Sequence, residues 1–297
     1  MVSTLKSTET AIDHVGVVAR DIAGLRAAYS RLGFVVSQAT PLMQPGPDGK
    51  GDVSLGQVSA HVNFVDSYLE LTAVRHLGQG SHLDKWLARH EGLHILALQT
   101  SDAAASLRDL IGAGLVMPPL RAASRQASAG TLSGAAKFKW FELPESIARE
   151  GFVCVVEHIT PELVFGNDAH PNGAWGLRTV FAVVENMDEA FARYQRLPGT
   201  KKKSFLVGRS ILMRDQQFVV VEPKGFNALF PGATAPTAPA LGGFTLAVAD
   251  IAVTRGVLEA AAVPFHFWGD KGIWVGPDFT GGAVLVFVEE RRETEDV

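Results

Sequence analysis

The sequence contains a unit that recurs four times, and this repeat restricts the possible folds more than any other feature. Each copy has an apolar β-type run, a helix that starts at a capping residue, and three more β-type runs. The expected helix-start residues are Asp21, Ser101, Asn186 and Asp250. The order of one strand, one helix and three strands predicts an α+β fold of four βαβββ units.

Length and composition set the class of protein. The 297 residues suggest about two domains, which we place at residues 11–165 and 176–289. Residues 117–135 are rich in Ala, Ser, Gly and Arg, and we expect a long loop there. The composition, 47% hydrophobic and 20% charged, is typical of a soluble globular protein.

Charge and cysteine content bear on partners and compartment. The net charge of −4 and the lack of a long basic run argue against a nucleic-acid partner, and no apolar run is long enough to span a membrane. The single cysteine, Cys154, excludes an intrachain disulfide, fits a reducing compartment, and is expected to be a buried packing residue. The polar first ten residues do not read as a signal peptide. We expect a cytoplasmic protein, monomeric or homodimeric, that binds a small molecule.

Counting back from the helix starts compares the four units residue by residue. The residues seven positions before each helix start are His14, His94, Thr179 and Gly243. The last strands of the units end in a similar acidic pattern, at Glu70, Glu157, Glu222 and Glu289. The first two units therefore carry a histidine and a glutamate at matching places, and the last two units lack the histidine.

These matched residues predict a metal site shared by the first two units. If the two units pair face to face, His14, Glu70, His94 and Glu157 come together. Imidazole and carboxylate ligands suit Fe(II), Mn(II), Zn(II) or Ni(II), and open positions on such a metal can bind a substrate with two neighbouring oxygens. Because neighbouring strand residues face opposite sides, His158 can replace Glu157 as a ligand but cannot join it.

Further residues are candidates for acid–base chemistry and substrate binding. Glu70, if it is not a metal ligand, can move a proton, and His61 on a neighbouring strand can act as a general base. A surface or core role is the alternative for His61. Arg121 and Arg125, in the expected loop, can bind a carboxylate, and a solvated loop is the alternative for them.

Several of these segments resemble the glyoxalase-like branch of the vicinal oxygen chelate superfamily. They are the strand around His14, Tyr68–Leu71, the strand around His94, and Glu157–Val164 with His170–Ala174. The resemblance covers residues 11–175 well, and the last two units match in pattern only. It implies paired βαβββ units forming cupped mixed sheets, with metal ligands on first and last strands, here His14, Glu70, His94 and Glu157 or His158.

The resemblance implies three functional classes. The first is a divalent-metal enzyme of lyase or isomerase type that moves a proton on a small substrate with neighbouring oxygens. The second is an Fe(II) ring-cleaving dioxygenase, although the usual members of that class hold their metal in the second pair of units, where Thr179 and Gly243 stand here. The third is a non-catalytic protein that binds a ligand in the cup.

Overall fold

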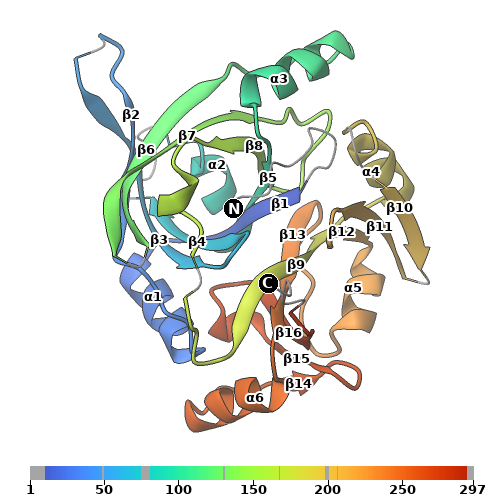
Figure 1. Cartoon of the computed structure of the whole chain (residues 1–297). Coiled ribbons are helices and arrows are strands. Elements are labelled where there is room, and N and C mark those ends of the chain that lie inside the picture. Colours follow the sequence, from blue (N-terminus) through green and yellow to red (C-terminus); the bar gives the residue numbers. More distant parts are fainter. Residues whose placement is uncertain are drawn as a thin grey trace.

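The computed structural model shows two eight-stranded β-sheets, each made of two βαβββ units (Figure 1). It describes residues 11–48, 50–74, 81–129, 131–166, 168–197, 201–205 and 207–292. The predicted α+β fold of four such units is confirmed.

The first sheet closes into a barrel. Its first unit comprises β1 (Ala11–Ala19), α1 (Ile22–Arg31), β2 (Thr40–Pro45), β3 (Asp52–Asn63) and β4 (Tyr68–Val74). After the short helix α2 (Asp84–Leu87), the second unit comprises β5 (Gly92–Gln99), α3 (Ala103–Gly112), β6 (Arg121–Ala129), β7 (Leu132–Glu142) and β8 (Phe152–His158). The strand order is β1-β4-β3-β2-β6-β7-β8-β5. The units meet at an antiparallel β1–β5 pair and again between β2 and β6, at Met43 and Ser124.

The second sheet has the same order but stays open. Its units comprise β9 (Ala174–Val183), α4 (Met187–Tyr194), β10 (Lys201–Phe205), β11 (Gly208–Met213) and β12 (Gln216–Val221), then β13 (Ala240–Val248), α6 (Ile251–Ala260), β14 (His266–Phe267), β15 (Gly272–Val275) and β16 (Val284–Glu289). Helix α5 (Pro223–Leu229) lies between the units. The order is β10-β11-β12-β9-β13-β16-β15-β14, so β10 and β14 are edges.

Each long helix begins at a side chain that accepts a hydrogen bond from the first turn, as capping residues do. Asp21, Asn186 and Asp250 have this role, as expected. In the second unit the cap is Asp102, whose Oδ1 accepts from the backbone nitrogen of Ala105 at 2.8 Å, and not Ser101. Because the units are aligned by their helix caps, each residue of β5 then corresponds to a β1 residue one position earlier than expected.

The long loop expected at residues 117–135 is wrong. Strands β6 and β7 form a continuous antiparallel ladder there, from the pair Arg121–Trp140 to the pair Ala129–Leu132. The Ala- and Ser-rich composition has low β-propensity, but pairing with β7 and closure of the barrel through β2 decide the conformation. Arg121 and Arg125 therefore lie on a strand.

One face of the second sheet is covered by α5 and the segment that follows it. Phe226 and Phe230 are fully buried there, and the ring of Phe230 packs edge-on against Phe181 and Trp274. A Cβ atom on Gly242 would come within 2.7 Å of the Phe226 ring, so the close approach of α5 to β13 requires glycine. The second sheet is therefore filled by the chain's own aromatic side chains.

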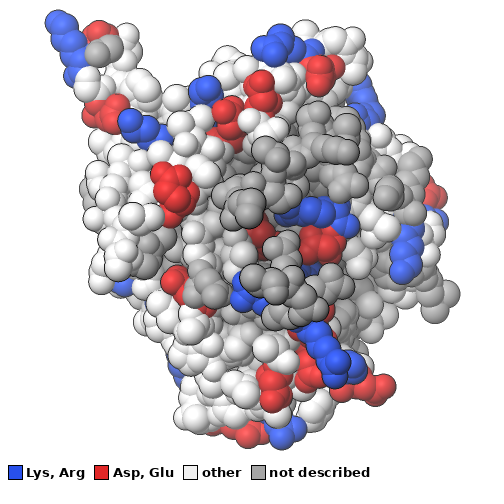
Figure 2. Space-filling model, in the orientation of Figure 1, with Lys and Arg blue, Asp and Glu red and all other residues white. Residues whose placement is uncertain are grey.

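Charged side chains are spread in small mixed groups over the face shown in Figure 2. Acidic and basic residues lie side by side there and do not form a large patch of one sign. No helix among the residues that the structure describes has the length and hydrophobicity needed to cross a membrane.

Buried polar side chains join the two sheets. Gln216 of β12 accepts a hydrogen bond from the backbone nitrogen of Ile12 at 2.6 Å and donates one to the Ile12 carbonyl at 2.9 Å. Glu150, which is fully buried, accepts from Arg193 Nη2 at 2.5 Å and from the Tyr194 hydroxyl at 2.6 Å. The first half therefore depends on the second for the partners of its buried groups.

We expect Glu150→Ala to lower the free energy of unfolding by about 3 kcal/mol, because it leaves the buried Arg193 guanidinium with one carboxylate fewer. Urea unfolding measures the change. Glu145→Ala is the matched control, since its side chain is 74% exposed, and we expect a change within about 0.5 kcal/mol. Equal effects of the two substitutions would contradict a stabilising role for the buried contact.

Candidate functional site

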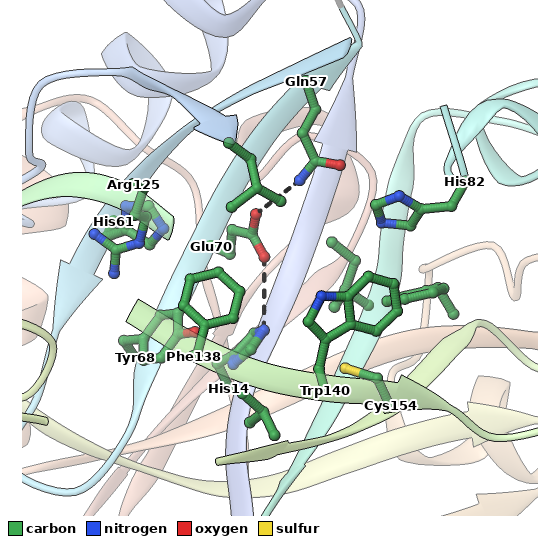
Figure 3. Close-up of a pocket in the computed structure, with 14 residues that line it drawn as sticks. His14, Gln57, His61, Tyr68, Glu70, His82, Arg125, Phe138, Trp140 and Cys154 are labelled. Carbon is green, nitrogen blue, oxygen red and sulfur yellow. Dashed lines mark hydrogen bonds and ion pairs between the residues drawn. The ribbon is translucent and has the colours of Figure 1, made fainter. Parts of the chain in front are cut away.

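The barrel contains a pocket of about 50 Å³ (Figure 3). Its walls combine aromatic and aliphatic side chains with six charged, imidazole or amide side chains, and small-molecule sites are commonly built from both kinds. The lining residues are His14, Leu42, Gln57, His61, Tyr68, Glu70, His82, Ile95, Arg125, Phe138, Trp140, Phe152, Cys154 and Val156.

His14 and Glu70 face each other at the centre of the pocket, with His14 Nε2 3.6 Å from Glu70 Oε2 (Figure 3). The other carboxylate oxygen of Glu70, Oε1, accepts hydrogen bonds from the hydroxyls of Ser59 and Thr72, each at 2.7 Å, and lies 3.5 Å from the Gln57 amide nitrogen. These contacts fix the carboxylate and leave Oε2 directed at the imidazole.

Asp13 contacts the ring nitrogen of His14 that faces away from Glu70. Its Oδ1 lies 2.7 Å from His14 Nδ1, and both its oxygens lie 3.1 Å from Nε2 of His158. Burial acts to raise the pKa of Asp13, but the two imidazoles, His158 foremost, outweigh it and hold the pKa well below its usual value. Because an ionised carboxylate only accepts, both ring nitrogens donate, and His14 presents Nε2 to the pocket.

A β-bulge brings Asp13 and His14 together. In the β1–β5 ladder Ile12 pairs with Leu98 and His14 with Ala97, so Asp13 is an extra residue in β1. A bulge of this kind changes the direction of neighbouring side chains and is common next to active sites. Asp13 was missed in the sequence analysis, where an acidic residue before the histidine was the only available signal.

Arg125, His61 and Tyr68 form a second polar group in the pocket. Arg125 is 7% exposed, and its Nη2 has no hydrogen-bond partner. Burial, with Arg125 nearby, holds the pKa of His61 well below its usual value, so this imidazole is neutral. Burial raises the pKa of Tyr68 well above its usual value, so the phenol keeps its proton. The arrangement presents one cation beside two neutral side chains.

The strand register identifies the residues that correspond to His14 and Glu70 in the second unit. In the β1–β5 ladder, His14 pairs with Ala97 and Gly16 with Ile95, so Ile95 corresponds to His14. Gly16 pairs with Glu70 across β1–β4, and Ala97 pairs with Cys154 across β5–β8. Cys154 therefore corresponds to Glu70. The residue that corresponds to His14 is Ile95 and not His94, because the second unit's helix cap is Asp102, one residue later than expected.

His94 lies outside the pocket lining. It is the bulged residue of β5, since Leu93 and Ile95 pair with consecutive residues of β1. Its Nε2 lies 2.8 Å from the backbone oxygen of His90, and the two rings pack 4.4 Å apart. The structure places His94 in packing at the end of the strand.

Glu157 also points elsewhere. Its Oε2 accepts from the backbone nitrogen of Ala103, the first residue of α3, at 3.0 Å. Glu289 does the same for Ile251 at 3.2 Å, and the repeated strand-end glutamate thus partners the start of its unit's helix. The register makes Ala73, and not Glu70, the first-unit counterpart of Glu157.

The structure thus brings together His14 and Glu70 and separates them from His94 and Glu157. His158 reaches Asp13, and Arg121 is exposed, with its guanidinium 5.3 Å from the centre of the Trp140 ring. Within the described ranges, no group of three or more His, Cys, Asp or Glu side chains is placed to hold one metal ion. The predicted metal ligation stays a prediction, with two of its four ligands facing each other.

The burial of His94 predicts a dependence of stability on pH. Burial lowers its pKa to about 4, whereas an unfolded histidine titrates near 6.5. The unfolded chain therefore binds more protons between these values, and the free energy of unfolding falls as pH drops from about 6.5 to about 4. We expect His94 to account for a loss of about 2 kcal/mol between pH 7 and pH 5.

Urea unfolding of His94→Gln at both pH values measures this contribution, since the variant should lose about 2 kcal/mol less than the parent chain on acidification. His266→Gln, at an exposed position of β14, is the control. An unchanged pH dependence in His94→Gln would contradict the prediction.

Comparisons with known structures agree on the fold. A hypothetical protein from Staphylococcus aureus is similar with a TM-score of 0.64 at 10% identity, covering 95% of this chain and 100% of that one. The Mn(II)-bound glyoxalase from Novosphingobium aromaticivorans gives 0.55 at 13% identity, over 97% and 84%. A variant of 4-hydroxymandelate synthase from Streptomyces coelicolor gives 0.58 at 13%, over 97% and 95%. At such identities these similarities show a shared fold alone.

Sequence comparison gives the family. No curated protein matches the sequence significantly. The model of the glyoxalase-like domain matches residues 12–198, which include every residue that lines the pocket. The chain therefore belongs to the glyoxalase-like domain family of the vicinal oxygen chelate superfamily.

Proposed function

We propose that the barrel is the active site of an enzyme in which the His14–Glu70 pair transfers a proton on a small, oxygen-bearing substrate. The observation that carries this proposal is the 3.6 Å approach of His14 Nε2 to Glu70 Oε2 inside the pocket, with the remaining polar atoms of both side chains held by other residues. Two positioned groups of this kind are what general acid–base catalysis requires.

The pair starts with a neutral imidazole and a carboxylate. It takes a proton from a carbon next to an oxygen-bearing carbon, and the electron pair left on the substrate is delocalised onto that oxygen. Asp13 stabilises the imidazolium that results when His14 holds the proton, because the two groups are 2.7 Å apart in a buried site. Return of the proton to another carbon of the substrate completes an isomerisation. In a lyase-type reaction the electron pair instead forms a double bond to the adjacent carbon, the bond from that carbon to a leaving oxygen breaks, and the proton goes to that oxygen.

A divalent metal is the alternative that the family suggests, since a similar structure is a glyoxalase with bound Mn(II). His14 Nε2 and Glu70 Oε2 would be its ligands, and Asp13 behind His14 resembles the carboxylate that often supports a ligating histidine. The second unit contributes Ile95, which has no donor atom, and Cys154, whose pKa is raised well above its usual value by burial. These residues do not fit a four-ligand centre.

The proposed step therefore uses no metal. Dependence on Fe, Mn, Zn or Ni, and with it the Fe(II) dioxygenase class, stays a prediction of the sequence. Elemental analysis of anaerobically purified protein tests it.

Proton exchange with solvent tests the proposed reaction directly. The protein is incubated in D₂O with a panel of small hydroxy- and oxo-carboxylates, and NMR records loss of the substrate C–H signals. We expect Glu70→Gln and His14→Gln to slow the exchange by at least about 100-fold, the usual contribution of a positioned acid or base.

Glu157→Gln and His94→Gln are matched controls, because the structure places both residues outside the pocket. We expect them to keep the exchange rate of the parent chain. Losses of rate and of bound metal in all four variants would instead support the four-ligand site. Ligand binding without exchange of any substrate would support the non-catalytic class.

A further inference from the structure

Arg125 lies in the pocket without an anionic partner. Its side chain is 7% exposed, its Nη2 makes no hydrogen bond, and no ion pair found among the described residues includes it. A buried cation that lacks a partner carries a large desolvation cost, which an anion placed beside it offsets. Binding of a negatively charged ligand next to the guanidinium is therefore favoured.

The carboxylates near Arg125 already have other partners. Glu70 is the one acidic residue of its lining, and the contacts with Ser59, Thr72 and His14 use both oxygens of that carboxylate. Asp13 is held by two imidazoles. The neutral His61 and Tyr68 beside Arg125 can donate or accept hydrogen bonds but cannot balance its charge.

A second unpaired polar atom belongs to Gln57, which lies beside Glu70 on the side away from His14 (Figure 3). Gln57 is 2% exposed, and its Oε1 has no partner, while its amide nitrogen is directed at Glu70. A buried carbonyl oxygen without a donor costs free energy, so it favours a ligand that brings a hydroxyl or amine hydrogen. Figure 3 shows Arg125 and His61 on one side of Glu70, with His82 and Trp140 on the opposite side.

We propose that Arg125 binds the carboxylate of the substrate, and that the pocket selects a small hydroxy-carboxylate with an apolar remainder against Trp140. This inference rests on the proposed function, since it assigns the substrate class of the same site. A planar guanidinium pairs with a carboxylate through two parallel hydrogen bonds. That contact places the carbon next to the carboxylate near the His14–Glu70 pair, and a hydroxyl on the substrate donates to Gln57 Oε1.

Calorimetric titration with mandelate tests the proposal by binding alone. We expect Arg125→Gln to weaken mandelate binding by at least about tenfold, the loss expected for a hydrogen bond to a charged group. Arg125→Lys, which keeps the charge, should retain part of the affinity. Arg108→Gln is the control and should bind mandelate as the parent chain does, because Arg108 is exposed on α3 and does not line the pocket.

Ligand variation separates charge from shape. Mandelamide, a neutral analogue of mandelate, should bind the parent chain much more weakly than mandelate does. Gln57→Leu should weaken mandelate and leave phenylacetate, which lacks the hydroxyl, unchanged. Inorganic phosphate and sulfate should not compete with mandelate.

Several outcomes would overturn the inference. They are no binding of mandelate to the parent chain, equal affinity of Arg125→Gln, equal binding of mandelamide, or competition by phosphate, which would indicate a general anion site. Glu70→Gln separates this inference from the proposed reaction, because it should abolish exchange yet keep or strengthen mandelate binding. If mandelate binding depends on Arg125 but Glu70→Gln exchanges substrate protons as fast as the parent chain, the proposed reaction is refuted and the binding inference stands.

Discussion

The buried carboxylate of Asp13 is the constraint on which the candidate site depends. It sits in a bulge of β1, fixes His14 from behind, and binds His158 at the end of β8. β1 belongs to the first unit and β8 to the second, so one side chain joins the two units where they share a barrel. The low pKa of Asp13 keeps it ionised, and its charge determines which nitrogen of His14 faces the pocket.

The two halves show how one topology gives either a polar pocket or a tightly packed apolar cluster. In the barrel, the positions that face inward next to the central strands hold Glu70 and Cys154; in the second sheet, the register places Val219 and Val286 there. Phe226 then fills the space against these strands. A polar residue in such packing would lack partners, so the second half has buried apolar side chains where the first half has its pocket.

Part of this architecture was predictable from the sequence. The four units follow from hydrophobic periodicity and helix caps, and the structure places the two candidates His14 and Glu70 next to each other in the pocket. Errors arose where two neighbouring residues could both fill one structural position. Ser101 and Asp102 both make good caps, and choosing the first moved the comparison from Ile95 to His94.

Tertiary structure decided the remaining positions. Glu70 and Glu157 both end a strand in the sequence and looked equivalent. In the structure Glu157, like Glu289, accepts a hydrogen bond from the first backbone nitrogen of a helix. Arg125 was expected on a loop, but it lies on β6, which pairs with β7 and neighbours β2 in the closed barrel, and its side chain lines the pocket. The bulge at Asp13 has no sequence signature of its own, because it depends on pairing with β5.

The contact between Gln216 and Ile12 has a consequence for where the domain of this chain ends. Both backbone groups of Ile12 are bonded by the Gln216 amide, one residue before the bulge. The glyoxalase-like domain match ends at residue 198, so Gln216 lies beyond it. Residues 12–198 alone would therefore leave both backbone groups of Ile12, next to the Asp13 bulge, without these partners. The β1 strand of the glyoxalase-like domain is thus completed by a residue of β12 in the second sheet.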